Sequence, residues 1–118
     1  QFRIVFSIFL RSTTFDQARE TCQSFGDSWD LAVINFRVEY SYLKDLIGHN
    51  CISEGGFWMG YTHQSDSEAE TVFDKPAYWK IKWNKKDARS AGECVQLQNE
   101  RFIHADCAEQ VGVVQMAY

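Results

Sequence analysis

The sequence is poor in the features that mark several large classes of protein. It has one proline in 118 residues, no internal repeat and no low-complexity segment. No apolar run approaches the length of a transmembrane helix, so we expect no membrane insertion by this domain. Positive charge is also scarce, with 12 Lys and Arg against 16 Asp and Glu and a net charge of -4. This balance argues against nucleic acid as the main partner, because phosphate binding needs positive patches.

The signatures of common active sites are missing as well. The chain has no glycine-rich phosphate-binding loop. His49 and Cys51 are only two residues apart, but nothing in the sequence supplies an orienting group or an oxyanion hole for them. The carboxylates of residues 66–74 read as a solvated acidic run. We therefore expect that the protein is not an enzyme.

The four cysteines are few and widely spaced. Cys22, Cys51, Cys94 and Cys107 form none of the closely spaced pairs that zinc sites use. An even number of cysteines in a short chain indicates disulfides and an oxidising compartment. We expect a secreted protein or the extracellular part of a membrane protein.

What the chain has in quantity is apolar and aromatic material. Hydrophobic residues make up 45% and aromatics 15% of the sequence, which excludes a disordered chain. The length suits one domain, so residues 1–118 are expected to form a single unit with its own core. The aromatic excess favours a β-rich fold over a helical bundle.

The first half of the chain predicts one strand and two helices. Residues 2–10 place Phe, Ile or Leu at every second position, as in a strand. Thr14 with Gln17 three residues later is a capping-box signature, and the helix that follows buries Cys22. A second helix is predicted after Asn35. Its expected apolar stripe comprises Val38, Tyr42, Leu43, Leu46 and Ile47.

The second half predicts strands around a long irregular segment. Residues 57–61 read as a core strand, residues 94–97 and 102–104 as a hairpin, and residues 112–116 as a final strand. Residues 62–93 have no regular pattern, and a long irregular stretch in a small domain is usually functional. Helices and strands are grouped rather than alternating, which favours an α+β fold with an antiparallel sheet. Pairing of the first and last strands would bring the termini together.

Several of these segments carry a resemblance when they are read in order. Phe57-Trp58-Met59-Gly60-Tyr61 is similar to a "WIGL" core strand, and Gly92-Glu93-Cys94-Val95 to an "ExCV" segment. The other similar segments are residues 14–22, residues 31–34 with Glu39 and Leu43, Trp79, Trp83 and Cys107. Together they resemble the C-type lectin-like family over nearly the whole chain. The resemblance implies a C-type lectin-like fold, with two helices packed on small antiparallel sheets and a long irregular loop region.

The resemblance fails at the residues that hold calcium in sugar-binding members. Those members use an EPN or QPD tripeptide in the long loop and an Asn-Asp pair after an aromatic residue. Here residues 83–94 contain neither tripeptide. Where the aromatic residue and the Asn-Asp pair would stand, the chain has Phe102-Ile103-His104. Ile103 has no oxygen, and calcium needs six or more oxygen ligands. The resemblance therefore implies that no calcium binds at the family's sugar site, and no other cofactor is expected.

The cysteines also depart from the family pattern. In the family the first-helix cysteine pairs with one in the last strand, but that position is Gln115 here. Cys94 and Cys107 are expected to pair and close the hairpin. Cys22 and Cys51 remain. They pair with each other, or Cys51 is free, or Cys51 forms a disulfide between the two chains of a dimer.

The long loop carries an acidic first half and a basic second half, with tryptophans between the charges. Solvated or paired charges around core tryptophans are one interpretation. The other is a ligand surface that grips sulfate or carboxylate groups of a protein or glycan on a cell surface or matrix. The candidate contacts are Lys82, Lys85, Lys86, Asp87, Arg89, Glu93, Arg101 and His104.

The leading hypothesis is thus a calcium-independent domain for recognition or adhesion. A second is a structural component of a matrix or mineralised layer, in which residues 66–74 meet mineral or cations. A third is calcium-dependent carbohydrate binding through rearranged ligands.

Overall fold

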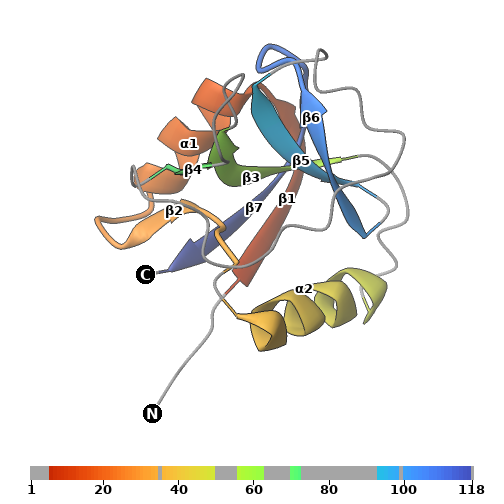
Figure 1. Cartoon of the computed structure of the whole chain (residues 1–118). Coiled ribbons are helices and arrows are strands. Elements are labelled where there is room, and N and C mark those ends of the chain that lie inside the picture. Colours follow the sequence, from red (N-terminus) through yellow and green to blue (C-terminus); the bar gives the residue numbers. More distant parts are fainter. Residues whose placement is uncertain are drawn as a thin grey trace.

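The computed structural model describes residues 6–34, 36–49, 56–62, 70–72, 93–98 and 100–117. Along the chain the elements are β1 (Phe6–Thr13), α1 (Phe15–Gln23), β2 (Trp29–Leu31), α2 (Arg37–His49), β3 (Phe57–Thr62), β4 (Glu70–Thr71), β5 (Cys94–Gln98), β6 (Arg101–Ala105) and β7 (Val111–Ala117). The strands form one sheet in the order β1-β7-β3-β5-β6, with β2 paired to β7 and β4 paired to β3 (Figure 1). The predicted α+β fold is confirmed.

The first helix forms as its cap predicts. The Thr14 hydroxyl accepts a hydrogen bond from the Gln17 N–H at 3.4 Å, and the Gln17 side chain accepts one from the Thr14 N–H at 3.4 Å. This reciprocal arrangement satisfies two of the donors that a helix N-terminus leaves open. Phe15, Ala18 and Cys22 form the buried face of α1, as expected.

The second helix buries only part of the predicted stripe. Leu43 is buried as expected, and Leu46 and Ile47 are half-buried. Val38 is 62% exposed and Tyr42 is 47% exposed, so two members of the predicted stripe point to solvent. The buried residues are Glu39, Tyr40 and Leu43. Glu39 is turned inward because its carboxylate accepts a hydrogen bond from the Phe36 N–H at 3.0 Å, at the start of the helix.

The first and last strands pair as predicted. Phe6 of β1 lies opposite Met116 of β7 in an antiparallel register. The expectation of a purely antiparallel sheet is wrong at one place, because β3 and β7 run parallel with Phe57 opposite Gly112. A parallel pair needs a long connection, and the loop and hairpin between β3 and β7 supply it.

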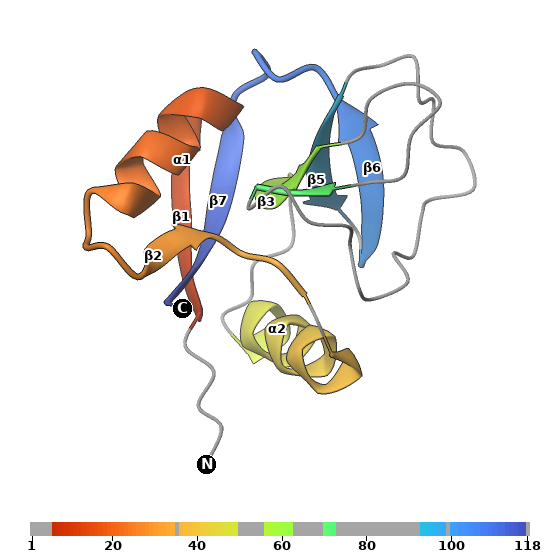
Figure 2. The ribbon, with the colours of Figure 1, turned by 60° about the vertical axis from the view of Figure 1, so that its left-hand side comes forward.

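The core lies on both faces of β3. Successive residues of a strand point to opposite faces. Phe57 and Met59 therefore pack in a cluster with Tyr40 and Leu43 of α2, whereas Trp58 packs in a second cluster with the buried face of α1. The two helices thus cover opposite faces of the central sheet, as the two views suggest (Figures 1 and 2).

Candidate functional site

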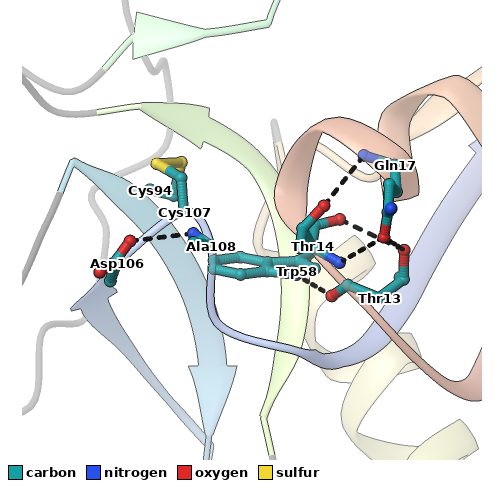
Figure 3. The surroundings of a disulfide bond; sticks show 8 residues. All are labelled: Thr13, Thr14, Gln17, Trp58, Cys94, Asp106, Cys107 and Ala108. Atoms are coloured by element: carbon teal, nitrogen blue, oxygen red, sulfur yellow. Dashed lines mark hydrogen bonds between the residues drawn. A yellow bond between two sulfur atoms is a disulfide. The ribbon is translucent and has the colours of Figure 1, made fainter.

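The β5–β6 hairpin is closed by the predicted disulfide. Cys94 and Cys107 are bonded, with their Cα atoms 5.2 Å apart (Figure 3). The Cys107 carbonyl accepts a hydrogen bond from the Phe15 N–H at 3.0 Å, which ties the start of α1 to the segment after β6. Nearby, the Trp58 indole N–H donates to the Thr13 carbonyl at 2.8 Å. The hairpin is therefore anchored to the core at the end where the long loop enters β5.

The structure describes Ile103 and His104, which lie where the resemblance would place a calcium ligand. Ile103 lies on β6, opposite Gln96 of β5, and is half-buried. His104 lies opposite Val95 and is 7% exposed, so its ring faces the core side of the hairpin. Within the described ranges, no group of three or more His, Cys, Asp or Glu side chains is arranged to hold a metal ion.

The expected ligand contacts do not gather at one place where the structure describes them. Glu93 precedes β5, whose first residue Cys94 pairs with Ala105. Arg101 pairs with Gln98 at the other end of the hairpin. Five residues at about 3.4 Å each put Glu93 and Arg101 about 17 Å apart along the strand. Both are exposed. The remaining expected contacts, Lys82, Lys85, Lys86, Asp87 and Arg89, lie outside the described residues.

Cys22 is a buried free thiol. Of the alternatives that the sequence left open, its pairing with Cys51 is therefore not formed. Its side chain belongs to the same buried cluster as Leu31, Trp58 and Val113, where it acts as a small apolar group. Burial raises the pKa of the Cys22 thiol to about 12, and the Asp30 carboxylate adds to the shift. A thiol of this kind is unreactive. Cys51 itself lies outside the described residues.

A polar network that joins α1 to β2 was not foreseen from the sequence. The Asp30 carboxylate is buried and accepts hydrogen bonds from the Arg19 guanidinium, the Gln23 amide and the Leu31 N–H. Arg19 also donates to the Val72 carbonyl at 3.1 Å. The partners are 11 residues apart in sequence, and no local pattern pairs charges at that spacing.

Two hollows flank α1. One has a volume of about 360 Å³ and lies against the Asp30 network and β2. The other has a volume of about 650 Å³ and lies between α1 and β1, lined mainly by Ser, Thr, Gln and Glu side chains. The region of α2 carries a different feature, because Phe36, Val38 and Tyr42 are all exposed. Phe6 of β1 stacks on Tyr42 with ring centroids 5.8 Å apart.

Neither described helix has the length and apolarity that crossing a membrane requires.

No curated protein matches the chain significantly in sequence. The solved structures are more informative, since 282 of their chains match significantly.

Three of these structures illustrate the range of proteins that share the fold. Ovocleidin-17, a major protein of the eggshell calcified layer of Gallus gallus, has 21% identity and a TM-score of 0.80, with coverage of 95% of this chain and 89% of that one. The mouse scavenger receptor C-type lectin carbohydrate-recognition domain has 21% identity and a TM-score of 0.79, with coverage of 98% and 90%. A calcium-independent type II antifreeze protein has 17% identity and a TM-score of 0.76, with coverage of 98% and 87%.

At these identities the solved structures establish the fold alone. The family model is the stronger comparison, because the model of the lectin C-type domain matches residues 11–114 and so covers most of the chain. It confirms the resemblance that the ordered segments carry. This chain belongs to the C-type lectin domain family.

Proposed function

We propose that residues 1–118 form a single extracellular, non-catalytic recognition domain that binds a protein or an anionic glycan without calcium. The observation that carries this proposal is the triplet Phe102-Ile103-His104 on β6. An apolar side chain stands where the calcium-binding members have an oxygen donor, and the neighbouring imidazole is buried. Recognition by this domain then depends on direct contacts from protein side chains.

The contact surface in this proposal is the long loop between β3 and β5. Lys82, Lys85, Lys86 and Arg89 supply cations that pair with sulfate or carboxylate groups. Glu93 is exposed beside the anchored end of the hairpin, where this loop returns to the sheet. Cationic contacts of this type weaken with salt, because mobile ions screen exposed charges.

The test is a glycan and protein binding screen in calcium and in EDTA, followed by salt titration of any ligand found. We expect binding that is unaffected by EDTA and weakened by salt. The double variant Lys85→Glu with Lys86→Glu should lower affinity about tenfold or more. Arg37→Glu is a matched control, because Arg37 is an exposed cation on α2.

Two outcomes would overturn the proposal. Sugar binding that EDTA abolishes would favour calcium-dependent binding through rearranged ligands. Binding that ignores both salt and the charge reversals would remove the cationic surface from the mechanism.

A role in a matrix or mineralised layer is the second candidate. It is favoured by the shared fold with ovocleidin-17, a protein of a calcified layer. In this chain the acidic residues Asp66, Glu68, Glu70 and Asp74 would meet mineral or cations. Selective adsorption to growing carbonate or phosphate crystals, lost when these four residues are made neutral, would support this role over the first.

A further inference from the structure

The hollow between the end of α1 and β2 has the properties of a second binding site, and we propose that it binds an organic cation of the guanidinium class. Its volume of about 360 Å³ lies in the range of small-ligand sites. The side chains and the glycine that line it are Arg19, Gln23, Gly26, Asp27, Ser28, Trp29 and Asp30. Both views place β2 apart from the β5–β6 hairpin (Figures 1 and 2), and this inference does not rest on the function proposed above.

The charges that line this α1–β2 cleft leave one carboxylate without a counter-charge. The Asp30 carboxylate accepts hydrogen bonds from the Arg19 Nε at 3.2 Å and the Arg19 Nη2 at 3.3 Å, so these two charges cancel. It also accepts from the Gln23 Nε2 at 3.4 Å and from the Leu31 N–H at 2.8 Å. Asp27 is the remaining charged residue, and its carboxylate forms no ion pair in the part of the chain that the structure describes. The lining therefore carries a net negative charge, which favours a cation.

The rim of the cleft offers hydrogen-bond acceptors. Asp27 and Ser28 stand at the corners of a tight turn, because the Trp29 N–H donates to the Gly26 carbonyl at 3.1 Å. Both residues are exposed, and neither bonds to another residue that the structure describes. The Gln23 amide nitrogen is already engaged, which leaves its Oε1 as the open end of that side chain. A cation that carries several N–H groups matches these acceptors.

Trp29 forms the aromatic wall of the cleft. Its ring is half-buried and lies beside that of Phe25, with the ring centroids 6.3 Å apart. The turn before it depends on Gly26, whose φ of 145° is a conformation that other residues rarely adopt. Among aromatic side chains an indole attracts cations most strongly, through the negative face of its ring. The cleft thus places an indole close in sequence to an unpaired carboxylate.

A guanidinium ion suits both the carboxylate and the indole. Its plane stacks on an aromatic ring, and its forked N–H groups bind a carboxylate through two parallel hydrogen bonds. An anion would be repelled by Asp27. A calcium ion needs six or more oxygen ligands, which is more than the side chains of Asp27, Ser28 and Gln23 supply. A quaternary ammonium ion has no N–H group to donate to the rim.

The test is an amide NMR titration of the whole chain with methylguanidinium chloride in EDTA, at an ionic strength held constant with sodium chloride. We expect saturable shifts with a Kd on the order of millimolar. The shifted resonances should fall in residues 19–30 and include the Trp29 indole N–H. Methylurea has the same planar shape without the charge, and methylammonium has the charge without the planar fork. Both should bind about fivefold more weakly or worse.

A pair of charge-neutralising variants separates the cleft from the rest of the surface. Asp27→Asn should weaken the binding of methylguanidinium about fivefold, because it removes the charge and keeps the size of an exposed side chain. Glu20→Gln is the matched control and should leave the affinity unchanged, because Glu20 is exposed on α1 but lines the other hollow. Acetyl-arginine methylamide then distinguishes the source of the cation. Tighter binding than methylguanidinium assigns the cleft to an arginine side chain, and weaker binding assigns it to a free guanidinium compound.

Three results would overturn the inference. The first is the absence of saturable shifts at about 50 mM methylguanidinium, far above a millimolar Kd, or shifts that lie outside residues 19–30. The second is binding of methylurea or methylammonium as tight as that of methylguanidinium, because the cleft would then not select a charged planar group. The third is an equal effect of Asp27→Asn and Glu20→Gln, which would assign the binding to the net charge of the domain.

Discussion

Arg19 and Asp30 form an ion pair that links α1 to β2, with the guanidinium Nε 3.2 Å from the nearer carboxylate oxygen. The Asp30 side chain is 6% exposed and that of Arg19 is 36% exposed. The carboxylate is thus deep in the protein while its partner reaches the surface. A buried carboxylate is stable only while its partners remain.

Replacing Arg19 with Met should therefore destabilise the domain. Loss of one partner of a fully buried pair costs about 3–5 kcal/mol. Because Arg19 is partly exposed, we expect about 2 kcal/mol, measured by urea unfolding. The double variant Arg19→Met with Asp30→Asn should lose less than the sum of the two single variants. Strict additivity in this cycle would mean that the two residues are not coupled.

The buried Cys22 thiol predicts a loss of stability in alkali. Because its pKa is about 12 in the folded chain, the folded state keeps a proton that the unfolded state releases. The stability that Cys22 contributes is fully present below about pH 9 and declines as the pH rises toward 12. The slope from this one group is at most about 1.4 kcal/mol per pH unit.

Urea unfolding between pH 9 and pH 10 isolates the effect of Cys22. Burial also raises the pKa of Tyr40 and of Tyr61, but tyrosine begins to titrate about one unit higher. Cys22→Ala should flatten the dependence of the unfolding free energy on pH in this window. An unchanged slope in Cys22→Ala would assign the effect to other groups.

The third prediction concerns the disulfide that the family forms between the first helix and the last strand. We expect that this disulfide can be introduced here at Cys22. Gln115 lies on the same face of β7 as Val113, which belongs to the same buried cluster as Cys22. The Gln115 side chain is buried, and its Oε1 has no hydrogen-bond partner in the described structure, so its removal should cost little. Gln115→Cys should form a disulfide with Cys22 and stabilise the domain by about 2–4 kcal/mol.

The measurement is a count of free thiols in the unfolded protein by alkylation and mass, with thermal unfolding in the presence and absence of reductant. Gln115→Ser is the control, because it removes the amide without adding a thiol. If Cys22 remains alkylatable in Gln115→Cys, α1 and β7 do not face each other as described.

Local features of this fold were predictable from sequence, and features that depend on distant partners were not. The cap of α1 and the disulfide-closed hairpin rest on residues that are close in sequence or match a family pattern. The predicted buried face of α2 was wrong in part, because Glu39 turns inward to cap its own helix. No hydrophobic pattern reveals such a cap. The parallel β3–β7 pair and the Arg19–Asp30 pair arise from tertiary packing. Of the expected ligand contacts, Glu93 and Arg101 proved to lie far apart because they belong to opposite ends of one hairpin.

A substitution at Gln96, in the middle of β5, should stabilise the domain. Its side chain is completely buried, and within the described structure neither its Nε2 nor its Oε1 has a hydrogen-bond partner. Burying an amide without partners costs about 1–3 kcal/mol relative to an apolar group of similar size. Gln96→Leu should therefore raise the free energy of unfolding by about 1 kcal/mol.

Gln98→Leu is the matched control, because Gln98 lies two residues along the same strand and is only half-buried. It should change the free energy of unfolding by less than about 0.5 kcal/mol. Both variants can be compared with the parent by urea unfolding at one pH. If Gln96→Leu instead destabilises the domain, Gln96 is satisfied in solution by a bound water or ligand. In that case the hydrogen bonds of the Gln96 amide to its water or ligand would help to stabilise the fold.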